Sequence, residues 1–198
     1  LDRRRPGGLP SASPRRETDR VTILSGVFEG KTTGTPISLF IQNADAHSAS
    51  YDDLRNLYRP GHGDITYAQK YGIRDHRGGG RASGRETAAR VAAGAVAGKI
   101  LARQGVRVTA FTRALGGVVA EGTDLSILDA NPLRCPDSEA AKIMTSRLEE
   151  ARQSGDSLGG IVEIHVSGCP AGLGEPVFDK MDADLAKALM GIGTVKGV

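Results

Sequence analysis

A glycine-rich loop that runs directly into a long helix is the feature that most constrains the fold of this chain. The loop, Arg77-Gly78-Gly79-Gly80-Arg81, precedes a run of apolar residues at helical spacing. Ser83 and Glu86 form a capping-box pattern, in which Ser83 accepts from the N–H three residues on and Glu86 bonds back to the Ser83 N–H. The pattern predicts a helix from Arg85 to about Arg103, and its many small residues predict close packing on several sides.

The same loop and helix start have the composition of a site for a multiply charged anion. Glycines let the backbone approach a ligand without Cβ clashes, and a helix N-terminus adds free N–H donors and partial positive charge. Arg81 and Arg85 add full charges. Upstream, Arg59-Pro60-Gly61-His62 presents a histidine from a turning backbone, and the neighbouring Asp64 is placed to tune the protonation of His62. Phosphate is the expected ligand.

Short apolar runs separated by turn residues make up most of the remaining chain. Strands are predicted at Val21–Ser25, Ile37–Gln42, Val106–Phe111 and Ile161–Val166, and further helices at Asp137–Gln153 and Asp179–Met190. The polar residues 43–58 predict a loop. A chain of 198 residues fits one domain with a sizeable core, so we expect a single domain over residues 1–198.

The segment Gly26-Val27-Phe28-Glu29-Gly30-Lys31-Thr32 is similar to a phosphate-binding P-loop but lacks its spacing. A P-loop has four residues between its glycines and a helix after its lysine. Here three residues separate the glycines, and Thr33-Gly34-Thr35-Pro36 follows in place of a helix. We interpret the segment as a hairpin turn, which disfavours a kinase or NTPase.

Nucleic-acid binding through the arginine-rich loops is an alternative function. RGG elements that bind RNA occur as repeats in disordered tracts, whereas this chain has one copy leading into a helix. The absence of Trp and the 4% aromatic content argue against base stacking, and a net charge of +3 is compatible with either function. Binding to nucleic acid would weaken steeply with salt.

The cysteines and the hydropathy pattern indicate the cellular environment. Cys135 and Cys169 have no metal-ligand spacing, and a chain of this length needs no disulfide, so reduced thiols and a cytoplasmic location are expected. No apolar run approaches the roughly 18 residues of a membrane span. We expect no metal site, because Asp182 and Asp184 fit a solvated helix face, and we expect His165 on the more polar face of its strand.

Several long motifs, in the same order, resemble the chorismate synthase family. They are Arg59-Pro60-Gly61-His62 with Asp64, the segment from Gly78 to Thr87 with its alanine-rich helix, and Pro170-Ala171-Gly172-Leu173-Gly174-Glu175-Pro176 with Val195-Lys196-Gly197-Val198. The resemblance covers essentially the whole chain. It implies an α+β fold, a β-α-β sandwich with helices between antiparallel sheets, assembled as a homotetramer.

The resemblance also implies an activity. The family converts 5-enolpyruvylshikimate 3-phosphate to chorismate by a 1,4-anti elimination of phosphate, in the shikimate pathway of aromatic amino acid biosynthesis. This reaction of a carbon–oxygen lyase requires reduced FMN although it has no net redox change, and NADPH is the implied source of reducing equivalents. The partners expected are therefore a phosphorylated small molecule and other copies of the chain, with no nucleic acid and no membrane.

Individual residues acquire roles from the resemblance. His62 matches one of the family's two catalytic histidines, which exchanges a proton with the reduced flavin. The positions that match FMN-contacting segments are Arg81, Ala82, Ser83, Gly193 and Thr194, and Arg4 matches a position for NADP. The residues expected to bind the anionic groups of the substrate are Arg59, Arg85 and Arg3.

Two departures from the family pattern affect these expectations. Pro10 stands where the family usually has a further arginine of the NADP segment. The Gly-Glu-Ser-His-Gly motif with the second histidine, and the C-terminal part with further flavin contacts, are not in this sequence. We therefore expect an internal piece of the enzyme, with little or no activity and weak flavin binding when alone.

Overall fold

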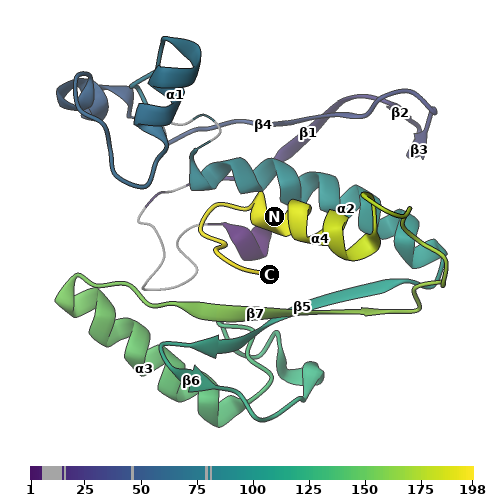
Figure 1. Ribbon diagram of the computed structural model, residues 1–198. Helices are drawn as coiled ribbons and strands as arrows, with labels where there is room; N and C mark the ends of the chain where they lie inside the picture. The colour runs from purple at the N-terminus through teal and green to yellow at the C-terminus, as the bar shows by residue number, and fades with distance from the viewer. Residues whose placement is uncertain (6–14, 16, 46, 79, 81) are drawn as a thin grey trace. The chain divides into compact units, whose positions relative to one another are not determined.

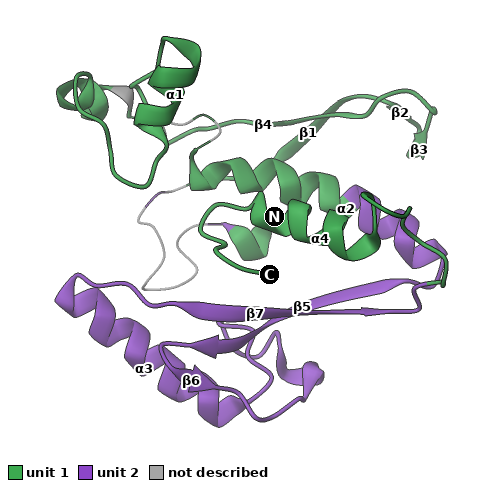
Figure 2. Ribbon diagram, viewed as in Figure 1, with its two compact units in different colours: residues 1–4, 17–95, 170–198 green, residues 5–16, 96–169 purple. Residues whose placement is uncertain are grey.

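The chain forms two compact units in the computed structural model, which describes residues 1–198 apart from 6–14, 16, 46, 79 and 81 (Figure 1). Figure 2 shows the two units in different colours. Unit 1 comprises Leu1–Arg4, Glu17–Ala95 and Pro170–Val198, and unit 2 comprises Arg5–Arg16 and Val96–Cys169. The boundary falls within one helix, α2, which belongs to unit 1 in its first half and to unit 2 in its second.

Unit 1 contains short antiparallel strands and helices. Its elements are η1 (Asp2–Arg4), β1 (Val21–Ser25), β2 (Val27–Phe28), β3 (Lys31–Thr32), β4 (Ser38–Ile41), η2 (Ser48–Leu54), α1 (Asp64–Tyr71), η3 (Gly84–Glu86), the first half of α2 (Thr87–Arg103) and α4 (Met181–Met190). Strands β1 and β4 pair antiparallel, with Ile23 opposite Leu39. The strands and helices predicted here from apolar spacing are confirmed to within about two residues.

The segment that is similar to a P-loop is a β-hairpin, as predicted. Strands β2 and β3 pair antiparallel, with Phe28 opposite Lys31. The two turn residues, Glu29 and Gly30, both have positive φ, of 46° and 74°. Such a two-residue turn matches the twist of the flanking strands, and it leaves no helix start for a phosphate.

Two local predictions in unit 1 are corrected. The polar residues 43–58, which were predicted to form a loop, contain the 3-10 helix η2. The short helix α1 begins directly after Gly63, where no helix was predicted. The hydrogen bonds predicted for the capping box are wrong. Ser83 Oγ accepts from the N–H of Arg85, and the Glu86 side chain binds Arg90. The chain enters α2 through the 3-10 turn η3, which brings a different N–H within reach of Ser83.

Unit 2 is an antiparallel sheet with one long helix. Its elements are the second half of α2, β5 (Arg107–Leu115), β6 (Val118–Val119), η4 (Leu125–Ile127), α3 (Ser138–Ser154) and β7 (Gly160–Ser167), with strand order β6-β5-β7. Asp137 caps α3 by accepting from the N–H groups of Glu139 and Ala140. Met144 and Cys135 are fully buried in the main core cluster of this unit.

The predicted α+β class is confirmed, since helices accompany antiparallel pairs in both units. The expectation that α2 is closely packed on several sides is wrong for this chain. Within α2 only Ala88 and Ala92 are buried among the described residues, and Ile100 is 62% exposed. In the described part of the chain, no helix is both long and apolar enough to cross a membrane.

Candidate functional site

The loop between Arg59 and Asp64 presents His62 as predicted, from a backbone that two glycines shape. Gly61 and Gly63 have positive φ, of 73° and 70°, which other residues adopt only under strain. The exposed ring of His62 is held by Nδ1, 3.0 Å from the carbonyl oxygen of Pro60. A carbonyl only accepts, so Nδ1 carries the proton and donates it. In the neutral ring Nε2 is then unprotonated and available to take a proton.

Asp64 is the buried centre of this loop. Its carboxylate accepts from Arg59 three times, from the backbone N (3.0 Å), Nε (3.0 Å) and Nη2 (3.1 Å). It also accepts from Arg74 Nη1 at 2.5 Å, and Arg74 Nη2 donates to the carbonyl oxygens of Leu54 and Arg55. The hydrogen bond from the Arg59 side chain is the largest effect that holds the pKa of Asp64 well below its usual range, and burial opposes it. The same bond raises the pKa of Arg59.

The ring of Tyr51 lies against both Arg59 and Gly78. The guanidinium of Arg59 lies 5.5 Å from the centre of the Tyr51 ring. Gly78 has a φ of 83°, and a Cβ there would come within 2.6 Å of the same ring. The absence of a side chain at Gly78 therefore admits the ring of Tyr51.

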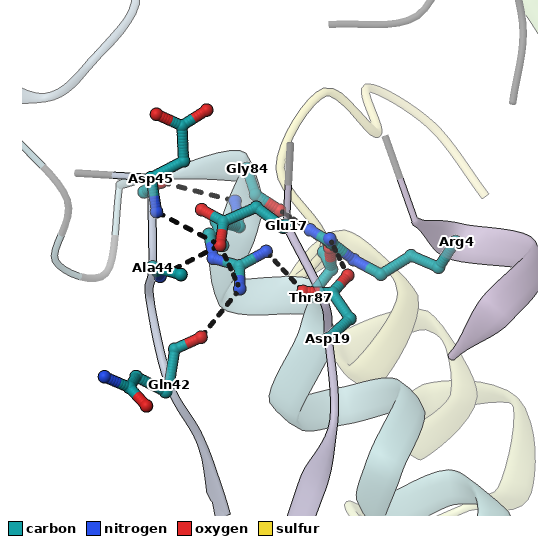
Figure 3. A network of polar contacts seen from close by, with 10 residues as sticks. Arg4, Glu17, Asp19, Gln42, Ala44, Asp45, Gly84 and Thr87 are labelled. Atoms are coloured by element: carbon teal, nitrogen blue, oxygen red, sulfur yellow. Dashed lines mark hydrogen bonds and ion pairs between the residues drawn. The ribbon is translucent and has the colours of Figure 1, made fainter. Parts of the chain in front are cut away.

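A second cluster of charges lies at the start of α2 (Figure 3). Arg85 Nη1 is 2.7 Å from Asp19 Oδ1, and Arg85 Nη2 is 3.4 Å from Glu17 Oε2. Both carboxylate side chains have no exposed surface. Glu17 Oε2 also accepts from the backbone N–H groups of Ala44 and Asp45, while Glu17 Oε1 is buried without a hydrogen-bond partner among the described residues. Glu17 thus joins Arg85 to the chain that follows β4.

Arg4 completes this second cluster. Its Nη1 donates to Asp19 Oδ2 at 3.2 Å, its Nε and Nη2 reach Thr87 Oγ1, and its Nη2 also donates to the carbonyl oxygen of Gly84. All three guanidinium nitrogens of Arg4 are therefore engaged within the chain. The bonds tie the N-terminal turn η1 to the first turn of α2.

The two clusters differ in net charge. Arg59 and Arg74 share one carboxylate, which leaves one positive charge, whereas Arg4 and Arg85 are balanced by Asp19 and Glu17. The Nη1 atom of Arg59 has no recorded bond within the described part of the chain, and its side chain is 20% exposed. Arg85 Nη1, by contrast, is buried. An external anion would find its counter-charge in the Asp64 cluster.

The remaining predicted site residues belong to unit 1. Ala82 is exposed, and Ser83 bonds the N–H of Arg85. A bond from Arg90 Nη2 to the carbonyl oxygen of Gly191, at 2.7 Å, brings the segment that leads to Gly193 and Thr194 to the first turns of α2. Arg3 is exposed in η1. The predicted Arg81, and Pro10 of the NADP segment, lie outside the described residues.

A carboxylate–histidine pair also occurs in unit 2. Glu163 accepts from Arg113 Nε at 2.5 Å and lies 2.6 Å from His165 Nε2. The bond from Arg113, followed by that from His165, lowers the pKa of Glu163 to about 2. The ring of His165 meets Phe111 edge to face. His165 thus lies beside charged neighbours, as predicted for the more polar face of its strand.

The sequence did not predict that three carboxylates, Glu17, Asp19 and Asp64, would bind the arginines of the site. It also did not predict that Arg74 would join Arg59 at Asp64. Glu17 and Asp19 follow the basic N-terminal segment, and a pair of acids at alternate positions beside a predicted strand was the available signal. Asp64 was expected to act on His62, but its recorded bonds go to Arg59 and Arg74. A guanidinium offers five donors and competes for a carboxylate more effectively than an imidazole does.

The comparisons with known proteins agree with one another. The family model described as chorismate synthase matches residues 1–198. A chorismate synthase of Syntrophus aciditrophicus (strain SB) is 71% identical over 201 residues, covering all of this chain and 57% of the relative, and one of Syntrophobacter fumaroxidans is 63% identical, covering 56% of the relative. A crystal structure of chorismate synthase superposes with a TM-score of 0.72 at 32% identity, over 89% of this chain and 53% of that chain.

The chain therefore spans about half the length of the curated relatives that it matches. The match of the family model over all 198 residues, the identities above 60% and the likeness of the folds lead to one conclusion. This chain belongs to the chorismate synthase family.

Proposed function

We propose that this chain is part of a chorismate synthase, a carbon–oxygen lyase that eliminates phosphate from 5-enolpyruvylshikimate 3-phosphate to give chorismate. Membership of the family supports the reaction. The structural observation that carries the proposal is the surplus positive charge on Arg59 and Arg74, in the same loop region as a histidine with a free Nε2. This region is therefore suited to bind a multiply charged anion and to accept a proton.

Each residue of the loop has a distinct role in the proposal. Arg59 binds an anionic group of the substrate through its Nη1 edge, because the Nε edge is already bonded to Asp64. His62 takes up and returns a proton at Nε2, since Nδ1 is held on Pro60. Arg85 and Arg3 remain proposed substrate contacts on the resemblance alone, and for Arg85 this requires that it leave Glu17 or Asp19.

The residues present fit part of a flavin site. At Gly193 a Cβ would meet no atom within 4 Å, and Ala82 is exposed, so both segments have open surface for a ligand. We propose that Ala82, Ser83, Gly193 and Thr194, with Arg81, hold FMN. Reduced FMN, when bound, supplies electron density as phosphate leaves. NADPH as the source of reducing equivalents, with Arg4 as its contact, is the least supported part, because all three nitrogens of Arg4 are engaged internally.

The proposal extends to the oligomeric state and the cellular location of the enzyme. A homotetramer in the cytoplasm, with residues 1–198 as part of one domain, is what the family implies, and no nucleic acid or membrane takes part. The alternative of a nucleic-acid-binding protein has less support, because the clustered arginines of unit 1 are bonded to carboxylates of the same chain.

Calorimetric titration of the purified 198-residue chain tests the proposal. We expect saturable binding of 5-enolpyruvylshikimate 3-phosphate together with reduced FMN under anaerobic conditions, and little or no turnover. His62→Gln should bind the substrate as the parent chain does, because Arg59 is the proposed contact. Absence of saturable substrate binding contradicts the proposal, as does tight nucleic-acid binding that weakens steeply with salt and ignores the substrate. Turnover at the rate of a complete family member contradicts the expected inactivity.

A further inference from the structure

The side chain of Asp64 binds the arginines on either side of it in the sequence, and the N-cap of its helix is Gly63. Asp64 is the first residue of α1 and is 5% exposed. Three of its four recorded hydrogen bonds come from Arg59, five residues earlier. Two of these three come from the side chain and reach different carboxylate oxygens, which is the bidentate geometry that fixes a guanidinium in orientation as well as position.

These bonds close a ring around the loop that carries His62. The backbone bond from Arg59 N to Asp64 Oδ2 joins the two ends of the segment 59–64. Inside the ring, the N–H of His62 reaches the carbonyl oxygen of Arg59 at 3.4 Å, and His62 Nδ1 lies on Pro60. Residues 61 and 63 are both glycine, which has no Cβ, so the loop has access to other conformations when nothing closes it. The position of the imidazole therefore depends on the closure at Asp64.

The same bonds decide which edge of Arg59 faces outward. Asp64 occupies the Nε–Nη2 edge, and the ring of Tyr51 lies against the guanidinium. The Nη1 edge is the one without a recorded bond in the described part of the chain. Arg74 fixes the carboxylate in turn, through a 2.5 Å bond from Nη1 and two bonds from Nη2 to backbone carbonyls. The orientation of Arg59 is thus set by a carboxylate that is itself held in place.

We propose that Asp64 is a positioning residue, which holds the Nη1 edge of Arg59 ready for an anion of the substrate and keeps the His62 ring in the Nδ1–H form with Nε2 free. This inference rests on the proposed function for the identity of the anion and of the proton acceptor. The ring closure and the bidentate pair are independent of it. Asp64 touches neither the substrate nor the flavin in this arrangement, and it acts through Arg59 and the loop.

The chain offers a matched control at Asp75. Asp75 accepts from the backbone N, Nε and Nη2 of Arg77, the same three donors, at 3.1, 2.9 and 2.8 Å. Its side chain is 58% exposed, and the one residue between Asp75 and Arg77 is His76, whose Nε2 lies 3.8 Å from Asp52. Asp64→Asn and Asp75→Asn therefore remove the same kind of pair, once at the proposed centre and once at the surface.

Two readouts on the 198-residue chain test the proposal. The ring ¹⁵N shifts of His62, assigned with His62→Gln, report which nitrogen carries the proton at a pH where the ring is neutral. Titration with inorganic phosphate reports the anion affinity. In Asp64→Asn we expect a shift toward the Nε2–H form, because the amide cannot accept from both donors of the fork. Loss of the carboxylate charge by itself favours anion binding, so the phosphate affinity is compared in Asp64→Glu, which keeps that charge. Asp75→Asn should match the parent chain in both.

A longer carboxylate separates position from charge, and it serves if Asp64→Asn does not fold. Asp64→Glu retains the negative charge but moves it by one methylene, so we expect phosphate affinity about fivefold lower than in the parent chain and a partial change of tautomer. A parent-like tautomer in a folded Asp64→Asn chain, or parent-like tautomer and affinity in a folded Asp64→Glu chain, would overturn the inference. If the parent chain binds no phosphate, Arg59 fails as an anion site in the proposed function, whereas the tautomer comparison still decides whether Asp64 positions His62.

Discussion

The Asp64 cluster and the Glu17–Asp19 cluster both pair arginine with buried carboxylate, but they leave the molecule with different charges. In the first, one carboxylate serves Arg59 and Arg74. In the second, two carboxylates serve Arg4 and Arg85. Arginine-rich motifs are commonly interpreted as anion sites, and the difference shows that the buried partners have to be counted first. Among the residues that the structure describes, the first cluster keeps a charge for a ligand and the second is balanced.

The two clusters also differ in how far they reach along the chain. Asp64 binds an arginine five residues earlier and another ten residues later, so its cluster shapes one loop. Arg4 donates to Thr87, which is 83 residues away, and Arg85 reaches the carbonyl oxygen of Gln42. The second cluster therefore joins three segments of unit 1, and it supports the helix start from which Arg85 projects.

The largest expected effect comes from removing the single carboxylate of the first cluster. Asp64→Ala leaves two guanidiniums without a counter-charge, and loss of one partner from a buried pair costs about 3–5 kcal/mol. Asp19→Ala should cost about 2 kcal/mol, because Glu17 remains beside Arg85. Urea unfolding followed by tyrosine fluorescence measures the first, since all four tyrosines lie between residues 51 and 71 and the chain has no Trp. Circular dichroism measures the second. Equal losses would remove the distinction between the clusters.

The acid dependence of stability tests the same carboxylate without truncating it. Bonds from Arg59 hold the pKa of Asp64 well below its usual range, so the unfolded chain takes up a proton first as the pH falls. The stabilisation by Asp64 is therefore complete above about pH 5 and is lost as the pH falls toward the pKa of the folded state. Urea midpoints from about pH 6 to about pH 3 should fall less steeply for Asp64→Asn than for the parent chain. The same slope in both would show that Asp64 is not the linked group.

A smaller effect is expected where the glycine loop meets Tyr51. Gly78 and Gly80 both have positive φ, so alanine at either position costs about 1 kcal/mol of backbone strain. At Gly78 the new Cβ would also displace the Tyr51 ring, whereas at Gly80 it would meet no atom within 4 Å. Loss of the contact between Tyr51 and Arg59 adds about 1 kcal/mol to Gly78→Ala. Equal unfolding free energies for the two variants would show that Tyr51 does not support Arg59.

Regular elements with a clear apolar period were predictable, and the short irregular ones were not. The 17-residue helices α2 and α3 and the strands β1 and β7 follow directly from apolar spacing. Helix α1 has only eight residues between Gly63 and Gly72, so it is too short for an apolar period to be recognised in the sequence. The exposure of α2 could not be predicted, because spacing indicates which face is apolar but not what covers it.

The members of the candidate site were predictable from motifs, and their bonding was not. His62, Arg59 and Arg85 stand in recognisable segments. Their partners depend on tertiary contacts: Glu17 and Asp19 reach Arg85 only because the chain before β1 returns to the start of α2. Asp64 was a visible neighbour of both His62 and Arg59, and local spacing alone did not decide which of them it would bind.

Phosphate binding gives the sharpest test of the comparison, because it measures directly which cluster holds an anion. Lysine keeps the positive charge but cannot hold Asp64 at one edge and an anion at the other, so Arg59→Lys should lower phosphate affinity about tenfold, or about 1.4 kcal/mol. Arg85→Lys should lower phosphate affinity less than Arg59→Lys does and lower stability more, because its Nη1 is buried against Asp19. Calorimetric titration with phosphate, alongside urea unfolding, separates the two outcomes. A comparable loss of affinity in Arg85→Lys would mean that Arg85 exchanges its carboxylates for the ligand, and that a balanced cluster can open to serve as an anion site.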